Sequence, residues 1–167
     1  IKSEFIKGLR VTGKETIEVV EQVLIEFNQE IVEALKKQSC NSETINSKIN
    51  NIISVIKEND ELGFVGTPTK IDQSIIDKIV NDKKVPVIAP LGLDENNQTY
   101  NINADTAAGY IAKKIEARRL IIMSDVEGVL DNNQKLIPEI NLTSIKELIK
   151  NETITGGMIP KINNCLD

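Results

Sequence analysis

The sequence predicts an α/β fold built on a mainly parallel sheet. Two continuous apolar runs, at 85–89 and 120–123, have the length and composition of strands that are buried on both faces. Between them, residues 106–117 carry the spacing of apolar residues that is typical of a helix. A strand, a helix and a strand in this order form a βαβ unit, which sets the two strands in parallel.

The composition fits one α/β domain over residues 1–167. Hydrophobic residues make up 40% of the chain and aromatic residues only 3%, so we expect an aliphatic core. The net charge of −5 and the lack of a basic cluster argue against nucleic-acid binding, and no apolar run is long enough to span a membrane. Two distant cysteines and no visible signal peptide favour a cytoplasmic protein. Because the sequence starts at Ile1 and stops at Asp167 just after a helix begins, we expect truncation at both ends.

The chain contains no histidine, which limits the chemistry that it can perform. Ser–His and Cys–His nucleophilic pairs are excluded, and so is an imidazole general base. Any reaction that this chain catalyses has to proceed without a histidine from the chain itself.

A long helix is predicted from the capping-box pair Thr12 and Glu15 to about Lys37, after a loop or short edge segment at 5–12. Its apolar positions recur with helical periodicity at Ile17, Val20, Leu24, Phe27, Ile31 and Leu35, and the face is widened by Val19, Val23 and Val32. This broad apolar face is a candidate dimer surface. The sequence leaves open whether it serves the core alone.

The next part of the chain has a weaker pattern. We interpret 39–60 as short strands joined by a turn, and 62–66 as a continuation of the same sheet. Pro68 is expected to end that region, and residues 74–82 to form a short helix before the strand at 85–89.

A polar cluster lies in the expected loop between Pro90 and the next helix. Asn101, Asn103 and Asp105 alternate with apolar residues, so in an extended backbone their side chains would share one face. The helix N-terminus that follows carries partial positive charge, which suits an anionic substrate. Asp105 could also be no more than the N-cap of that helix.

Two further site candidates follow. Ligands of open α/β sheets bind beyond the carboxyl ends of the strands, so the loop at 124–129 is the next candidate after the polar cluster. Residues 131–135 are expected to form a polar turn, and Thr143 to cap another helix.

The last expected helix opens over 155–161. Gly156 and Gly157 would allow the backbone to approach a ligand closely. Lys161 lies in the first turn, near the positive end of the helix, which hints at an anion bound nearby.

Taken together, five motifs resemble those of the acetylglutamate kinases in the amino-acid kinase family, and they occur in the same order. They are Gly8-Leu9-Arg10-Val11-Thr12, Leu62-Gly63-Phe64-Val65-Gly66, Tyr100-Asn101-Ile102-Asn103-Ala104-Asp105, Ser124-Asp125-Val126-Glu127-Gly128-Val129-Leu130 and Gly156-Gly157-Met158-Ile159-Pro160-Lys161. The resemblance covers essentially the whole chain.

The resemblance implies a three-layer α/β/α sandwich that transfers the γ-phosphoryl group of ATP to the side-chain carboxylate of N-acetyl-L-glutamate, in arginine biosynthesis. It implies that Arg10, Asn101 and Asn103 bind the substrate. Asp105 and Lys161 would be catalytic, Asp105 by orienting the catalytic lysines and Lys161 by neutralising the transferred phosphoryl group. The implied nucleotide-binding residues are Ser124, Asp125, Val126, Gly128, Gly156 and Gly157.

The same resemblance implies ATP and Mg²⁺ as cofactors, with the metal held mainly through the nucleotide phosphates and no dedicated metal-binding residues. It also implies a homo-oligomer, at least a dimer, and names a regulatory protein of the PII type as a candidate partner. Residues 1–105 would form mostly the amino-acid-substrate lobe and residues 106–167 mostly the nucleotide lobe. A carboxylate acceptor is ionised at neutral pH, so the missing histidine is consistent with this chemistry.

The sequence departs from the family in three places. The family's amino-terminal part, with an early lysine and two glycine-rich loops, has no counterpart, and neither have its closing strands and helix. Residues 42–50 lack the glycines that the family shows in the corresponding turn. The alternatives are therefore another kinase of the family, acting on aspartate, glutamate, carbamate or UMP, or an incomplete fragment that acts only in self-association or in binding a regulatory protein.

Overall fold

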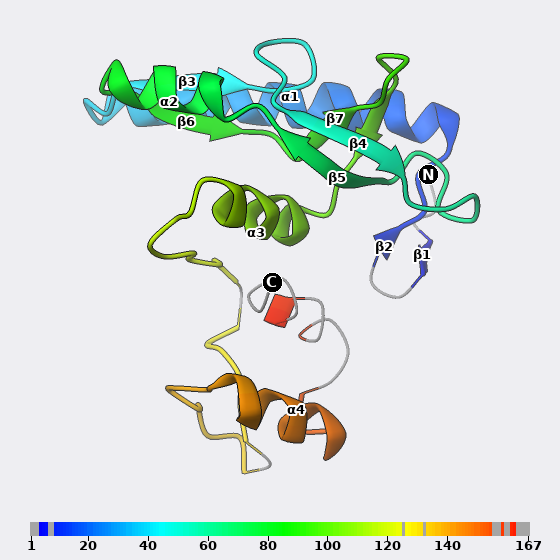
Figure 1. Cartoon of the computed structure of the whole chain (residues 1–167), viewed down its shortest axis with the longest axis vertical. Coiled ribbons are helices and arrows are strands. Elements are labelled where there is room, and N and C mark those ends of the chain that lie inside the picture. The colour runs from blue at the N-terminus through cyan, green and yellow to red at the C-terminus, as the bar shows by residue number, and fades with distance from the viewer. Residues whose placement is uncertain are drawn as a thin grey trace. The chain divides into compact units, whose positions relative to one another are not determined.

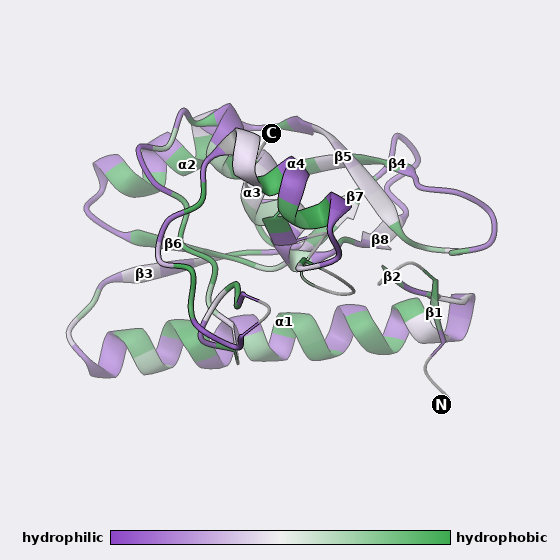
Figure 2. Cartoon of the chain, turned by 90° about the horizontal axis from the view of Figure 1, so that it is seen from below, coloured by the Kyte–Doolittle hydropathy of each residue, from purple (hydrophilic) through white to green (hydrophobic). Residues whose placement is uncertain are grey.

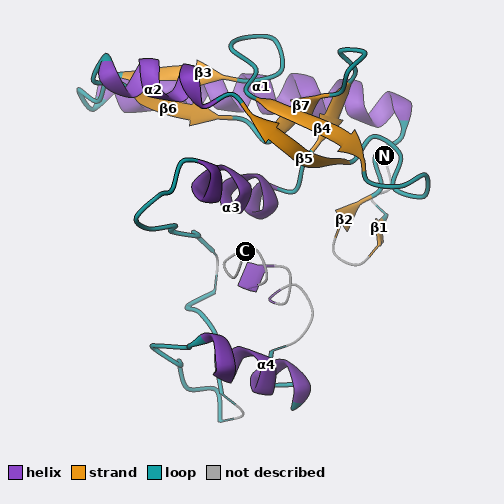
Figure 3. Ribbon diagram, in the orientation of Figure 1, coloured by secondary structure: helices purple, strands orange, loops and turns teal. Residues whose placement is uncertain are grey.

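The computed structural model describes residues 4–6, 9–124, 126–131, 133–154, 158 and 161–162 (Figures 1 and 3). The chain divides into two compact units, Ile1–Ala107 and Ala108–Asp167. This boundary lies close to the predicted division after residue 105. The assignment of one part to the amino-acid substrate and the other to the nucleotide stays a prediction.

The strands of the first unit combine parallel and antiparallel pairs. β3 (Ser42–Ile45) and β6 (Val85–Ile88) are parallel. A four-stranded sheet has the order β5-β4-β7-β8, in which β4 and β7 are parallel and the two outer pairs are antiparallel. Its strands are β4 (Ile53–Lys57), β5 (Gly66–Ile71), β7 (Leu91–Leu93) and β8 (Thr99–Asn101). A hairpin of β1 (Phe5–Ile6) and β2 (Leu9–Arg10) precedes them.

Two helices cover this layer of strands on opposite sides (Figure 2). α1 (Lys14–Lys37) packs against β3, β6 and β8, and α2 (Gln73–Asn81) packs against β6. Most of the buried apolar side chains of this unit are aliphatic, as the composition predicts, and they include Ile17, Ile45, Ile53, Leu91 and Ile102. The α/β class is confirmed, and the first unit shows the helix, strand and helix layers.

Helix α1 ends at Lys37 as predicted, but its predicted capping box is wrong. The N-cap is Gly13, which has no side-chain cap. Thr12 is instead fully buried, and its Oγ1 donates a hydrogen bond to the carbonyl oxygen of Arg10 at 3.0 Å. The hydroxyl is therefore used to fix the segment before the helix.

The apolar residues of α1 fall on two sides of the helix. Ile17 and Val32 are buried against the strands, whereas Val19, Val23 and Phe27 are 49%, 54% and 56% exposed. The periodicity predicted Phe27 on the buried face of α1, and this prediction is wrong. Asn28 takes the buried position at this turn of the helix, and the Phe27 side chain is exposed. The exposed residues recur every four positions and so form one stripe.

Residues 39–60 form short strands joined by a turn, as predicted. The turn lacks glycine but is closed by Asn46, whose Oδ1 accepts hydrogen bonds from the backbone N–H groups of Lys48 and Ile49, both at 2.9 Å. Asn50 adopts a positive φ of 54° in the same turn. Asn46 therefore closes the turn with its side chain, and Asn50 supplies the positive φ for which many turns use glycine.

Pro68 does not end the sheet region, which corrects the prediction. It lies inside β5, opposite Val55 and next to a bulge between Ser54 and Val55. Because β5 is the first strand in the sheet order, it has a neighbour on one side only, and a missing N–H is tolerated there.

The stretch between Pro90 and Asp105 is more ordered than predicted. It contains the antiparallel hairpin of β7 and β8, and α3 (Ala104–Lys114) begins soon after it. Since β8 ends at Asn101 and Asp105 is already helical, the three polar side chains do not alternate along one extended face.

The apolar run at 120–123 is not a strand, so the predicted βαβ unit is wrong in this structure. Ile121 and Met123 are 81% and 89% exposed, and no described strand pairs with the run. A strand needs a neighbour for its backbone hydrogen bonds, which an apolar pattern alone does not supply.

In the second unit, the predicted polar turn at 131–135 is confirmed. The carboxylate of Asp131 accepts hydrogen bonds from the backbone N–H groups of Asn133 and Lys135, at 2.8 and 2.9 Å. α4 (Leu142–Lys150) follows, and its cap is Asn141 rather than Thr143, because Asn141 accepts from the N–H of Ser144.

The expected helix at 155–161 lies largely outside the described residues. The described residues of this part of the chain, Met158, Lys161 and Ile162, are helical. Within the part of the chain that the structure describes, none of the helices combines the length and hydropathy needed to cross a bilayer.

Candidate active site

Backbone hydrogen bonds bring three distant segments of the first unit side by side. The N–H of Thr12 donates to the carbonyl of Leu62 at 3.0 Å, and the N–H of Phe64 donates to the carbonyl of Thr12 at 2.7 Å. The N–H of Asn101 in turn donates to the carbonyl of Phe64 at 2.9 Å. We call residues 10–12, 62–65 and 100–101 the motif junction, since they belong to three of the five sequence motifs.

Gly63 permits the close approach on which the motif junction depends. Its φ is +70°, a conformation that side chains with a Cβ rarely adopt. A Cβ at this position would lie 2.4 Å from the carbonyl oxygen of Thr12, which is far inside van der Waals contact. Glycine is therefore required where the two segments pair.

Thr12 links two predicted substrate-binding residues. Its hydroxyl donates to the carbonyl oxygen of Arg10, and the amide Nδ2 of Asn101 donates to the same hydroxyl oxygen at 3.5 Å. Sequence reasoning assigned Thr12 to a helix cap and missed this role. Its place two residues after Arg10 in a recognised motif was the signal that could have indicated it.

Arg10 is exposed and is held by a cation–π contact. Its guanidinium carbon lies 5.3 Å from the centroid of the Phe5 ring. Such a contact uses the face of the guanidinium, which leaves its in-plane N–H donors suited to a carboxylate. Arg10 and Asn101 thus lie in one junction, with Thr12 between them.

The motif junction contains an aromatic pair, Phe64 and Tyr100. The centroids of Phe64 and Tyr100 are 5.8 Å apart, and Tyr100 is buried. Burial raises the pKa of the Tyr100 phenol, and the nearby Asp94 carboxylate raises this pKa further, so the ring is neutral at physiological pH.

Asn103, not Asp105, caps helix α3. The Oδ1 of Asn103 accepts hydrogen bonds from the N–H and the hydroxyl of Thr106, at 3.0 and 3.2 Å. The alternative reading of Asp105 as the N-cap is therefore wrong. Asp105 lies half-buried in the first turn, where a carboxylate is stabilised by the helix dipole.

In the second unit, two of the predicted nucleotide-binding residues, Val126 and Gly128, line a hollow of about 480 Å³. Gly128 has a φ of +144°, and a Cβ there would lie 2.8 Å from Cδ1 of Leu136. The walls combine aliphatic and polar groups from Val129, Leu130, Asp131, Gln134, Glu152, Thr153, Ile154 and Met158.

The other predicted residues of this unit are placed as follows. Ser124 is exposed, and Lys161 is half-buried within a helical turn. Asp125, Gly156 and Gly157 lie outside the described residues. Asp105 belongs to the first unit and Lys161 to the second, so their joint action stays a prediction.

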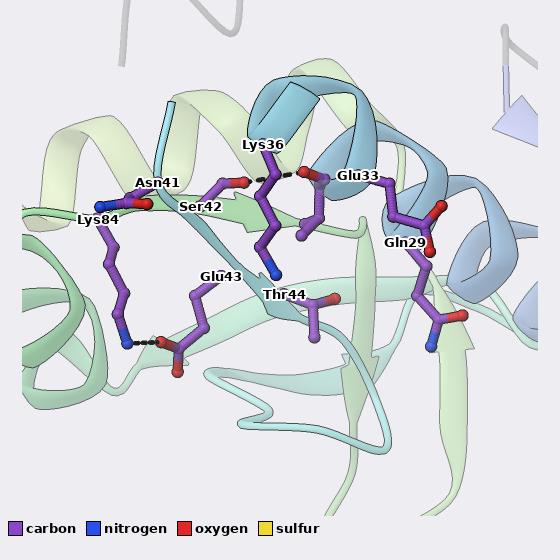
Figure 4. Close-up of a pocket in the computed structure, with 9 residues that line it drawn as sticks. Gln29, Glu33, Lys36, Asn41, Ser42, Glu43, Thr44 and Lys84 are labelled. Atoms are coloured by element: carbon purple, nitrogen blue, oxygen red, sulfur yellow. Dashed lines mark hydrogen bonds and ion pairs between the residues drawn. The ribbon is translucent and has the colours of Figure 1, made fainter. Parts of the chain in front are cut away.

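Another hollow, of about 500 Å³, lies in the first unit between α1 and β3 (Figure 4). Lys84 and Glu43 form an ion pair of 2.7 Å at its rim, and hydrogen bonding to Glu43 raises the pKa of Lys84. Its lining includes none of the predicted site residues. Among the described residues, no three His, Cys, Asp or Glu side chains are grouped so as to hold a metal ion.

The sequence model of the amino acid kinase family matches residues 1–167. The chain belongs to the amino acid kinase family. The match includes all three segments of the motif junction.

Two relatives in the amino acid kinase family are named acetylglutamate kinase. The protein from Pelagibacter ubique (strain HTCC1062) is 64% identical over 167 residues, which are 100% of this chain and 58% of that protein. The protein from Campylobacter fetus subsp. fetus (strain 82-40) is 47% identical over 169 residues, covering 100% of this chain and 60% of that protein. This chain thus spans less than two thirds of the length of these curated relatives.

A solved structure supports the fold of the family member described here. The crystal structure of smu.665 from Streptococcus mutans UA159 superposes with a TM-score of 0.90 at 31% sequence identity. The match covers 98% of this chain and 67% of that one.

Proposed function

We propose that the protein transfers the γ-phosphoryl group of ATP to the side-chain carboxylate of N-acetyl-L-glutamate. The observation that carries the proposal is the motif junction, in which Thr12 joins the Arg10 backbone to the Asn101 side chain. A cation and an amide in one junction suit the α-carboxylate of an acylated amino acid. The names of the relatives that are 64% and 47% identical support the choice of acceptor.

The chemistry needs no proton acceptor. The side-chain carboxylate of the substrate has a pKa of about 4.3 and is already ionised at neutral pH. One of its oxygens forms the new bond to phosphorus while the bond from phosphorus to the β-phosphate oxygen breaks, and ADP leaves. This balance fits a chain without histidine.

The protein's part in the reaction is positioning and charge stabilisation. Lys161 neutralises charge on the transferred phosphoryl group, and Asp105 orients the catalytic lysines. When bound, Mg²⁺ offsets the charge of the nucleotide phosphates. We propose that the metal is held mainly through the nucleotide phosphates, as the resemblance to the family implies.

We propose that the hollow around Val126 and Gly128 receives the nucleoside part of ATP, together with Ser124, Asp125, Gly156 and Gly157. Its aliphatic walls suit a purine base, and the carboxylates of Asp131 and Glu152 can accept hydrogen bonds from ribose hydroxyls. The proposal fits a volume of about 480 Å³.

The first experiment compares acceptors on the protein at its full natural length. ADP release from Mg-ATP is measured with N-acetyl-L-glutamate, L-glutamate, L-aspartate, carbamate and UMP. We expect turnover with N-acetyl-L-glutamate alone. Turnover with another member of the panel, or with none of them, would contradict the proposed acceptor.

Arg10→Ala should raise the KM for N-acetyl-L-glutamate about 10- to 100-fold and change kcat less than about threefold. The guanidinium is proposed to bind the α-carboxylate, which carries the same charge in the ground state and in the transition state. Steady-state kinetics with each substrate varied in turn checks this expectation.

Arg10→Lys is the graded control, because it keeps the charge but loses the two-pronged geometry, and its KM should be intermediate. A fall in kcat at unchanged KM for either variant would show that Arg10 acts on the reacting group instead.

We also propose that a second copy of the chain covers the exposed stripe of Val19, Val23 and Phe27. These side chains line up at intervals of four residues on α1 and are about half exposed or more. An apolar stripe of this kind on a long helix fits the self-complementary surface of a two-fold dimer. A regulatory protein of the PII type and action in the cytoplasm stay predictions.

Phe27→Glu should convert the proposed dimer into monomers, because it places a charge within the proposed interface. Sedimentation velocity at several protein concentrations measures the effect. Gln29→Glu adds the same charge elsewhere on α1 and should leave the dimer intact. Unchanged association of the Phe27→Glu variant would place any interface away from the stripe.

A further inference from the structure

We propose that Glu21 is a positioning residue, which anchors β8 to α1 and thereby holds Asn101 in place for the acceptor. The inference rests on the proposed function, because it takes Asn101 to be a substrate-binding residue. It adds a residue that none of the sequence motifs contains.

Glu21 collects three donors from two different segments. Its Oε1 accepts hydrogen bonds from Ser47 Oγ at 2.6 Å and from Thr99 Oγ1 at 2.7 Å. The ammonium of Lys48 lies 3.2 Å from the same oxygen. Ser47 and Thr99 are buried, and the Glu21 side chain is only 17% exposed.

The Glu21 carboxylate is ionised at neutral pH despite its environment. Burial raises its pKa, but the hydrogen bonds from Ser47, Thr99 and Lys48 together outweigh this effect and lower the pKa overall. Hydrogen bonds to an ionised acceptor are stronger than those between neutral groups. The bond from Thr99 is therefore well suited to fix a strand.

Strand β8 needs such an anchor because it lies at the end of the sheet order. It pairs with β7 on one side, and beyond it the structure gives a single bridge, between Val65 and Asn101. Thr99 is the first residue of β8 and Asn101 is the last. Through Thr99, α1 holds the first residue of the short strand whose last residue is Asn101.

The two hydroxyl partners of Glu21 allow its contact with β8 to be tested separately from its contact with the turn between β3 and β4. Thr99 belongs to the strand that carries Asn101, whereas Ser47 belongs to the turn between β3 and β4. Thr99→Val removes the hydroxyl at nearly constant volume, and Ser47→Ala is the matched control on the same carboxylate.

We expect Thr99→Val to raise the KM for N-acetyl-L-glutamate about 5- to 20-fold, with the KM for ATP and kcat changed less than about twofold. Ser47→Ala should leave all three constants within about twofold. Glu21→Ala should resemble Thr99→Val, and adding Thr99→Val to it should have little further effect on KM, because both remove the same bond. Glu21→Gln keeps an acceptor oxygen and should recover part of the loss.

A second measurement does not depend on turnover. The N–H groups of Asn101 and Ile102 donate to Phe64 and Pro90, each at 2.9 Å, and their hydrogen exchange reports whether the end of β8 is held. Thr99→Val and Glu21→Ala should speed this exchange at least about tenfold, and Ser47→Ala should not.

Equal effects of Thr99→Val and Ser47→Ala on KM and on exchange would overturn the proposal and leave Glu21 a general structural residue. Unchanged KM and exchange in Thr99→Val would overturn it as well. If the wild-type protein does not use N-acetyl-L-glutamate while the exchange pattern holds, the proposed function fails and the anchoring of β8 by Glu21 stands.

Discussion

Lys161→Ala should lower kcat about 10²- to 10³-fold while changing the KM of either substrate less than about threefold. Charge on the phosphoryl oxygens spreads during transfer, and a fixed cation stabilises that distribution more than it stabilises bound ATP. Steady-state kinetics at saturating Mg-ATP and N-acetyl-L-glutamate gives both constants. The effect should be the largest of any single replacement considered for the site.

The control for Lys161 is Lys150→Ala. Lys150 is an exposed lysine in the last turn of α4, in the same unit of the chain. Its replacement should change kcat less than about twofold. A rise in the KM for ATP at constant kcat in the Lys161 variant would assign this lysine to ground-state nucleotide binding.

Gly63→Ala should lower the free energy of unfolding by about 2–4 kcal/mol and also weaken substrate binding. The added Cβ would lie 2.4 Å from the Thr12 carbonyl oxygen at a φ of +70°. Relief requires that the Thr12 and Phe64 hydrogen bonds separate, which opens the motif junction. Urea unfolding and the KM for N-acetyl-L-glutamate report the two consequences.

Gly13→Ala is the matched glycine control. A Cβ at Gly13 meets only the Thr16 hydroxyl, at 4.0 Å, so the loss of stability should stay below about 1 kcal/mol. If Gly63→Ala were as mild as Gly13→Ala, the close pairing at Gly63 would not be needed for the junction.

Local patterns predicted several elements because the information lies within each segment. The end of α1 at Lys37, the helix near 74–82 and the strand that begins at Val85 all follow from periodicity and turn residues. The resemblance to the family predicted Arg10 and Asn101 as substrate-binding residues. The structure places both in one junction, and their role in binding stays a prediction.

Helix caps were predicted less well, for a local reason. Thr143 and Asp105 were read as caps, but an asparagine two residues earlier performs this role in each case. Many residues near a helix start can cap it, and the backbone path of the preceding loop decides which one does.

Pairing between distant segments could not be read from the sequence. Pro68 is compatible with β5 only because that strand is at an edge, and the run at 120–123 is exposed because no described strand pairs with it. The partners of Glu21 are 26 and 78 residues away along the chain, so no local pattern contains them.

The most direct test of the proposed reaction identifies its product. An acyl phosphate reacts with hydroxylamine to give a hydroxamate, whereas phosphate esters and inorganic phosphate do not. With Mg-ATP, N-acetyl-L-glutamate and hydroxylamine, the protein at its full natural length should form one N-acetylglutamyl hydroxamate for each ADP released, and none with N-acetyl-L-glutamine. ADP release without hydroxamate, or hydroxamate from L-glutamate at an equal rate, would contradict phosphorylation of the N-acetyl-L-glutamate side chain.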